Sequence, residues 1–160
     1  MSQKTFEAIC SLLNGKNISY KHEHHETIGR SSDKASEIRG TKLSDGAKAL
    51  VLKTKSGKFF QAIIPADKKA NLKELKKLNG EKNVSLASPN EVLLLTDCVI
   101  GSVPPFGIFW NLIVFADKSL LGKKEVVFSA GTLEDSIFIS PKDLINCNNA
   151  SIVNIAKEKE

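Results

Sequence analysis

A lysine near the start of an apolar segment is the first candidate for chemistry in this 160-residue chain. In AKALVLKT, residues 47–54, strand alternation places Lys48 on the same face as Leu50 and Leu52, and the opposite face is apolar as well. A lysine in such a strand either snorkels out at the strand end or points into a lined cavity. Inside a cavity its ammonium group would bind a phosphate, a carboxylate or an ester oxygen. The residues alone leave both interpretations open.

The segment GSVPPFG, residues 101–107, is the second candidate. Its flanking residues, Gly101 and Gly107, permit positive φ and a close approach of the backbone to a ligand. Pro104 and Pro105 fix φ and remove two donors, so the remaining N–H groups of a rigid loop are available to a carbonyl or a ribose. The same residues suit a stiff connector between a helix and a strand, and the sequence does not separate the two roles.

Three histidines stand close together in YKHEHHET, residues 20–27. In a strand, His22 and His24 would share a face and could ligate a metal. No second cluster of His or Cys accompanies them, and the chain has neither a P-loop nor a GxGxxG segment. We therefore expect no metal and no cofactor.

Support for a protein nucleophile is weak. The three cysteines, Cys10, Cys98 and Cys147, lie far apart and form no CxxC pair, which is typical of small buried residues. There is no GxSxG elbow, and no histidine after position 25 could serve as a base for a serine. Any catalysis is expected to rely on positioning and electrostatics.

The elements that would position these residues alternate between helices and strands. Periodicity, caps and turn residues predict helices at 6–13, 32–38 (capped by Ser32), 72–79, 89–97 and 141–145, and strands at 17–22, 47–54, 58–65, 111–117, 124–131, 136–140 and 150–156. Ser56–Gly57 predicts a hairpin turn between the second and third strands. We expect an α/β (α+β) fold, a single domain over residues 1–160, with a curved, barrel-like mixed sheet and flanking helices.

Composition and charge limit the class of protein. The apolar fraction of 41% and the charged fraction of 26% are ordinary for a soluble domain. No apolar run approaches the roughly 20 residues that span a bilayer, and the first residues lack the layout of a signal peptide. The net charge of +5, with lysines clustered at 53–58, 67–77 and 157–160, permits binding to RNA. We expect a cytoplasmic protein with neither a membrane nor DNA as partner.

Three segments, GAKALVLK, NVSLASPNEV and TDCVIGSVPPFG in this order, closely resemble the YbaK/ProX family of aminoacyl-tRNA editing proteins. The family includes free-standing proteins that hydrolyse mischarged tRNA and a related domain inserted in bacterial prolyl-tRNA synthetases. The resemblance covers the chain from Tyr20 to the SPKDL segment at 140–144. It implies a pocket between the lysine strand and the GxxxP loop, and it favours the cavity interpretation for the lysine.

Carried over by position, the family's strand lysine is Lys48. Its loop implies catalytic roles for Gly101 and Pro105, with the substrate contacted by the rest of the loop and one strand histidine: His22, Ser102, Val103, Pro104, Phe106 and Gly107. The resemblance implies hydrolysis of the ester between an amino acid and the terminal adenosine of tRNA. Loop N–H groups would hold the carbonyl, Lys48 would orient the ester, and water or a substrate group would attack.

The sequence departs from the synthetase-inserted members at one point. Those members carry a histidine after a Gly-x-x-x-Asp stretch, whereas here Gly131 and Asp135 are followed by Ile137 and Phe138. Asp117 follows an apolar strand and is interpreted as structural. The role of the missing histidine in choosing the substrate therefore cannot be transferred to this chain.

The expected substrate is a small amino acid such as alanine or cysteine on proline tRNA, handed over by a synthetase or an elongation factor. Two other interpretations remain. One is a catalytically silent homologue that binds tRNA or a synthetase, and the other is a pocket that binds nucleotides through the same loop. Salt-sensitive tRNA binding without turnover would indicate the first of these.

Overall fold

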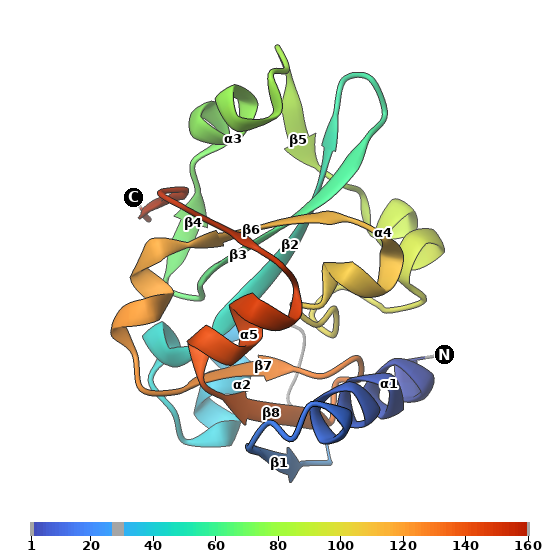
Figure 1. The fold of residues 1–160 in the computed structure, drawn as a ribbon, viewed down its shortest axis with the longest axis vertical. Coiled ribbons are helices and arrows are strands. Elements are labelled where there is room, and N and C mark those ends of the chain that lie inside the picture. The colour runs from blue at the N-terminus through green and yellow to red at the C-terminus, as the bar shows by residue number, and fades with distance from the viewer. Residues whose placement is uncertain (1, 27–30, 160) are drawn as a thin grey trace.

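The computed structural model describes residues 2–26 and 31–159, in which helices surround three β-sheets (Figure 1). The α-helices are α1 (Ser2–Gly15), α2 (Ser32–Arg39), α3 (Leu72–Asn79), α4 (Pro89–Thr96) and α5 (Pro141–Cys147), and short 3-10 helices span Leu43–Asp45, Gly107–Trp110 and Lys118–Gly122. The strands are β1 (Tyr20–His24), β2 (Ala47–Thr54), β3 (Phe59–Pro65), β4 (Lys68–Ala70), β5 (Val84–Leu86), β6 (Ile113–Asp117), β7 (Val126–Ser129), β8 (Asp135–Ile139), β9 (Ser151–Val153) and β10 (Ala156–Glu158). The predicted class, a mixture of helices with a mixed sheet, is confirmed.

The largest sheet has five strands in the order β5-β2-β3-β6-β9. Its β5-β2 and β2-β3 pairs are antiparallel, whereas its β3-β6 and β6-β9 pairs are parallel. The strands β1, β8 and β7 form an antiparallel sheet, and β10 pairs with β4. An isolated bridge between Gly46 and Val127 joins the two larger sheets. The expected barrel is therefore only loosely matched, because the described strands form three separate sheets and none of them closes.

The hairpin that carries the lysine is formed as predicted. The strands β2 and β3 pair antiparallel with Lys48 opposite Ile64, and Gly57 takes the turn at φ 93°. Strand β3 is buried along nearly its whole length, so β2 is fixed against the centre of the molecule. The position of Lys48 along the sheet follows directly from this register.

Helix caps agree with the sequence in part. At the start of α4, Ser88 and Glu91 form the expected capping box, and Gly80 ends α3 in a left-handed conformation. The cap of α2 was predicted wrongly, because Ser31 and not Ser32 accepts the hydrogen bond from the Lys34 N–H. The sequence places two serines side by side, and either could supply a cap oxygen.

The main core lies between the three-stranded sheet, one face of the five-stranded sheet, and the helices α1 and α5. Ile9 and Leu13 of α1 pack with Ile137 and Ile139 of β8, and Figure 1 shows α1 running beside β1 and β8. A second cluster, which includes Leu75 of α3, packs on the opposite face of the five-stranded sheet, because Ala62 and Ile64 belong to it whereas Ile63 belongs to the main core. Within the described residues, no helix has both the length and the apolar character needed to cross a membrane.

Asp117, at the end of β6, has the structural role expected for it. Its carboxylate accepts hydrogen bonds from the N–H groups of Ile155 (2.8 Å), Ala156 (2.9 Å) and Ser119 (3.1 Å). Burial alone would raise the pKa of this carboxyl group, but these hydrogen bonds outweigh it and hold the pKa below its ordinary value. Asp117 therefore fastens the chain between β9 and β10 to the sheet.

Candidate active site

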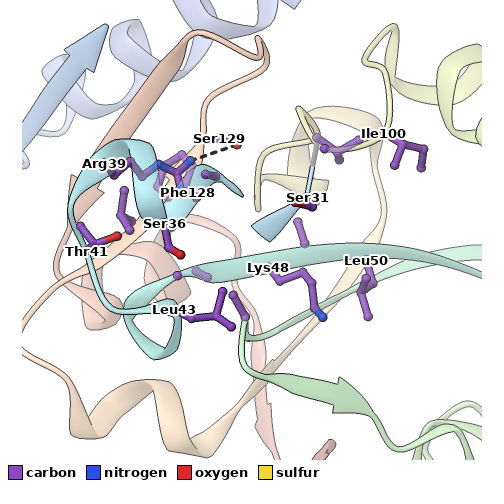
Figure 2. Close-up of a pocket in the computed structure, with 18 of the residues that line it drawn as sticks. Ser31, Ser36, Arg39, Thr41, Leu43, Lys48, Leu50, Ile100, Phe128 and Ser129 are labelled. Carbon is purple, nitrogen blue, oxygen red and sulfur yellow. Dashed lines mark hydrogen bonds between the residues drawn. The ribbon is translucent and has the colours of Figure 1, made fainter. Parts of the chain in front are cut away.

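A cavity of about 280 Å³ lies beside β2 and is the candidate active site (Figure 2). Its walls come from α2 with the segment that follows it, from β2, from β7 and from the loop after α4. Lys48, Gly101 and Val103 all line it. The structure therefore brings the lysine strand and the start of the Gly-Pro loop to one cavity, although the two are about fifty residues apart in the sequence.

Lys48 is half buried in this lining. Its Nζ donates a hydrogen bond to the backbone carbonyl of Lys68, at 3.0 Å. Burial, followed by repulsion from the Lys159 cation, lowers the pKa of Lys48 below its ordinary value of 10.5. A backbone carbonyl holds this ammonium in place, and no carboxylate of the described residues forms an ion pair with it. Its positive charge is therefore available to a ligand.

The two glycines of the loop serve different purposes. Gly101 has φ 92°, a conformation that side-chain-bearing residues rarely adopt. At Gly107, a Cβ would lie only 2.8 Å from Val114 Cγ2 and 3.1 Å from Gln61 Oε1, so glycine is required there by close packing. Among the described residues, the N–H groups of Gly101 and Val103 have no hydrogen-bond acceptor. Both residues line the cavity, where an oxygen of a ligand could accept from them.

The second half of the loop is held from behind by two buried amides. Gln61 on β3 accepts from the Gly107 N–H at 2.8 Å and donates to the Pro104 carbonyl at 3.1 Å. Asn148, after α5, donates to the Pro105 carbonyl at 2.7 Å. These contacts explain the rigidity of the Pro-Pro segment: each carbonyl is tied to the body of the protein by a side chain that a distant element supplies.

Five of the predicted loop residues, Ser102, Pro104, Pro105, Phe106 and Gly107, are buried and lie outside the cavity lining. Ser102 is fixed at both its hydroxyl group, which donates to the Val99 carbonyl, and its own carbonyl, which accepts from the Gly131 N–H. Contact of these five residues with the substrate stays a prediction. Their positions favour a role in which these five residues support Gly101 and Val103, the part of the loop that lines the cavity.

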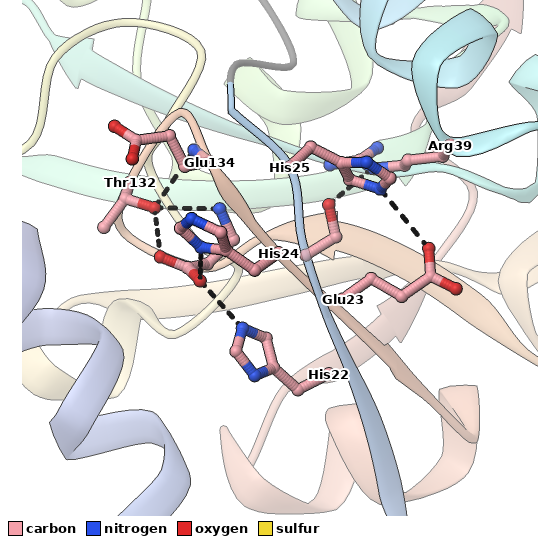
Figure 3. Close-up of polar contacts among 9 residues, drawn as sticks. His22, Glu23, His24, His25, Arg39, Thr132 and Glu134 are labelled. Atoms are coloured by element: carbon pink, nitrogen blue, oxygen red, sulfur yellow. Dashed lines mark hydrogen bonds and ion pairs between the residues drawn. The ribbon is translucent and has the colours of Figure 1, made fainter.

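His22 lies elsewhere, in a polar cluster on β1 and β8 (Figure 3). Its Nε2 is 2.7 Å and the Nδ1 of His24 is 2.9 Å from Asp135 Oδ1, and Thr132 donates to the other carboxylate oxygen. The ligand atoms of His22, His24 and Asp135 lie within 4.8 Å of one another, so these residues have the arrangement that could hold a metal ion. His22 does not line the cavity, and its predicted contact with the substrate stays a prediction.

Hydrogen bonds in this cluster shift two pKa values in opposite directions. The bond to Asp135 raises the pKa of His24 above its ordinary 6.5. Burial of Asp135 would raise the pKa of its carboxyl group, but hydrogen bonds from His24, Thr132 and His22 outweigh burial and lower it. No local sequence pattern pairs His22 with Asp135, because the two are 113 positions apart.

Arg39 is a cavity residue that the sequence did not single out. At the end of α2 its guanidinium donates from Nε to Ser136 Oγ at 2.7 Å and from Nη2 to Ser129 Oγ at 3.1 Å. Burial, partly offset by Glu23, lowers the pKa of Arg39 to about 10, which leaves it charged at neutral pH. Both serine partners lie about 90 positions or more along the chain, so no local pattern could have revealed the contact.

Comparison with known proteins identifies the family to which this chain belongs. A family model for the aminoacyl-tRNA editing domain matches residues 25–147, which include the lysine strand and the whole Gly-Pro loop. The chain belongs to this family. The resemblance seen in the sequence is thereby confirmed, and so is the expectation that the chain is a hydrolase of the aminoacyl-tRNA ester bond.

Among similar proteins, the multifunctional Ser/Thr-tRNA deacylase ProXp-y of Escherichia coli is 37% identical over 157 residues, which cover 96% of this chain and 93% of the relative. The solved structure of the hypothetical protein APE2540 is 26% identical, with a TM-score of 0.86 over 93% of this chain and 99% of that one. Another structure, provisionally described as a trans-editing enzyme for prolyl tRNA synthetase, has a TM-score of 0.80 at 24% identity, over 96% of this chain and 97% of that one. That last likeness concerns the fold alone.

Proposed function

We propose that this protein is a trans-editing deacylase, which removes a small, incorrectly attached amino acid from the end of a tRNA. The observation that supports this most directly is the meeting of Lys48 with the Gly101 and Val103 backbone at one small cavity. These groups are the ones that the reaction needs, a cation and free N–H donors near one ester. No described residue of the cavity has the arrangement of a protein nucleophile with its base.

The proposed reaction uses these groups to hold the ester while water attacks. The N–H groups of Gly101 and Val103 donate hydrogen bonds to the aminoacyl carbonyl oxygen and stabilise the negative charge that develops on it. Lys48 binds a neighbouring phosphate or carbonyl oxygen and orients the ester. The oxygen of the water forms a bond to the carbonyl carbon and the bond from that carbon to the ribose oxygen breaks. The ribose oxygen takes up one proton of the water and becomes a hydroxyl, and the second proton goes to solvent as the released amino acid ionises to a carboxylate. A group of the substrate could replace the water as attacking group.

The size of the cavity restricts the substrate. A volume of about 280 Å³ lies at the lower end of the range for ligand pockets, about 300–1,000 Å³. Small amino acids therefore fit best, and alanine and cysteine on proline tRNA were the candidates from the sequence. The name of the E. coli relative adds serine and threonine to this group. A synthetase or an elongation factor is the proposed partner that hands over the tRNA.

The test is deacylation of a panel of tRNAs charged with alanine, cysteine, serine or threonine, on proline tRNA and on the tRNAs that normally carry these amino acids. We expect deacylation of at least one of these small aminoacyl-tRNAs and no deacylation of correctly charged prolyl-tRNA. Binding of tRNA that weakens with salt, without turnover of any species, would instead indicate a silent binding module.

A further inference from the structure

The cavity is lined by a partly buried cation, Arg39, that the proposed reaction does not use. Arg39 makes hydrogen bonds to two serine hydroxyls, and within the described residues no carboxylate forms an ion pair with it. Its Nη1 has no acceptor among the same residues. A partly buried arginine with a free donor in a cavity wall is a hydrogen-bond donor for a ligand in that cavity.

The position of Arg39 separates it from the groups that would hold the ester. Figure 2 shows Arg39 beside Ser129 and Phe128, whereas Lys48 projects from β2 with its nitrogen turned away from them. Phe128 is 1% exposed, while Ile100, next to the Gly101 loop, is 43% exposed. Phe128 is thus buried, whereas Arg39, Ser129 and Lys48 are each partly exposed, and Arg39 with Ser129 is separated from Lys48 along the wall of the cavity.

Ser129 has a free donor of its own. Its Oγ accepts the hydrogen bond from Arg39, so its hydroxyl proton is available to another acceptor, and no described residue accepts it. Ser36, a neighbouring serine of the lining, differs in this respect because its hydroxyl donates to the Asp33 carbonyl. Among the described residues, the lining also includes Lys42 and Lys48 but no aspartate or glutamate. This part of the wall therefore offers donors to an uncharged or negative acceptor and disfavours a second cation.

From this arrangement we infer that Arg39 and Ser129 form the subsite that recognises the side-chain hydroxyl of a seryl or threonyl group on tRNA. The inference rests on the proposed function, because it assumes that the ester is held at Lys48 and Gly101. The substrate hydroxyl oxygen accepts a hydrogen bond from Ser129 Oγ or Arg39 Nη1. An alanyl group fits the space but leaves both donors unpaired, and a thiol is a weak acceptor.

The expected consequence is selection by hydrogen bonding. A pocket that distinguishes two substrates by one methylene reaches a preference in kcat/KM of only about 10–200-fold. A site built to bind a hydroxyl rejects the analogue that lacks it far more strongly. We expect seryl- and threonyl-tRNA to be deacylated at least about 10-fold faster, as kcat/KM, than alanyl groups on the same tRNA. Alanyl-tRNA serves as the reference in each variant, so a general loss of folding would lower all rates together.

The experiment compares the wild type with Ser129→Ala, Ser129→Thr and the matched control Ser36→Ala, using one tRNA charged in turn with serine, threonine and alanine. Ser129→Ala is expected to lower kcat/KM for seryl-tRNA about 10-fold or more while changing the alanyl rate less than about 2-fold. Ser129→Thr, which keeps the hydroxyl, and Ser36→Ala are expected to keep the wild-type preference.

Two results would overturn the inference. One is that the wild type deacylates alanyl-tRNA and seryl-tRNA with equal kcat/KM, and the other is that Ser129→Ala leaves the ratio of these two values unchanged. In either case the assignment of the subsite is wrong, although the proposed deacylase activity stands. If the wild type deacylates none of the three esters and none of the other panel members, the proposed function fails and the subsite fails with it. The two failures are therefore distinguishable.

Discussion

The Nζ of Lys48 lies 3.0 Å from the backbone carbonyl oxygen of Lys68, so strand β4 fixes the end of a side chain that starts on β2. Strand β4 is itself paired with β10 near the C-terminus. The ammonium is positioned by an uncharged acceptor, and its charge is not cancelled. A substrate oxygen therefore meets a cation that is already oriented.

Replacing Lys159 is expected to change the pH dependence of deacylation. The lowered pKa of Lys48 means that its cation is lost at a lower pH than the ordinary 10.5, so activity that needs the cation falls as the pH rises through the lowered value. Removing the repulsion of Lys159 in Lys159→Ala raises the pKa of Lys48. The alkaline decline of kcat/KM, after subtraction of uncatalysed hydrolysis, should then move to higher pH. Lys157→Ala, an exposed lysine of β10, is the control, and an equal movement in both variants would contradict the account.

Gly101→Ala is expected to lower both stability and activity. With φ at 92°, a Cβ at this position is strained, at a cost of about 1–3 kcal/mol, and relief of the strain would move the N–H groups that face the cavity. Gly15→Ala is a suitable comparison because Gly15 has open space around its Cβ position and no positive φ. Denaturant unfolding and deacylation should both be impaired in Gly101→Ala only. Unchanged kcat in that variant would show that the loop backbone does not hold the ester.

Gln61→Leu tests the support behind the loop. Gln61 is fully buried, and its loss leaves the Gly107 N–H and the Pro104 carbonyl without partners. At about 1–3 kcal/mol for each unpaired buried group, we expect about 2–6 kcal/mol of lost unfolding free energy. Urea titration measures the loss. A change within about 0.5 kcal/mol, the usual range for a surface substitution, would contradict this role.

The His24–Asp135 pair is expected to make stability depend on pH in a defined direction. A raised histidine pKa gives stability that is present below 6.5 and lost as the pH rises through the folded value. A lowered aspartate pKa gives stability that is present above 3.8 and lost as the pH falls through the folded value. The difference in Tm between wild type and His24→Gln should therefore be larger at about pH 5.5 than at about pH 8.5. Equal differences at both values would show that the pair contributes no stability.

The sequence predicted the hairpin, most helix ends and the family because these depend on local signals. Ser88 and Glu91 are three positions apart, and the capping box they form needs no information from the rest of the chain. The strand alternation around Lys48 is equally local. Whether the Lys48 side chain snorkels to solvent or lines a cavity depends on which segments face β2, and local sequence does not contain this information. The family resemblance was needed to favour the cavity.

The features that were not predicted come from distant segments. Arg39 meets Ser129 and Ser136, and His22 meets Asp135, only because β1, β7 and β8 pair in one sheet. The barrel-like sheet was expected from alternating strands, but alternation does not say where one sheet ends and another begins. Leu78 shows a further limit: it shares the spacing of Leu75, yet it is 43% exposed while Leu75 is buried.

The central claim is that Lys48 acts at the cavity that hydrolyses the aminoacyl ester. The most direct measurement is kcat/KM for the best substrate of the panel with Lys48→Ala beside Lys53→Ala, a lysine of the same strand that pairs with Glu91 and does not line the cavity. The account predicts a loss of about 100-fold or more for Lys48→Ala, with tRNA binding retained, and a change of less than about 3-fold for Lys53→Ala. Equal activity of the two variants would contradict it.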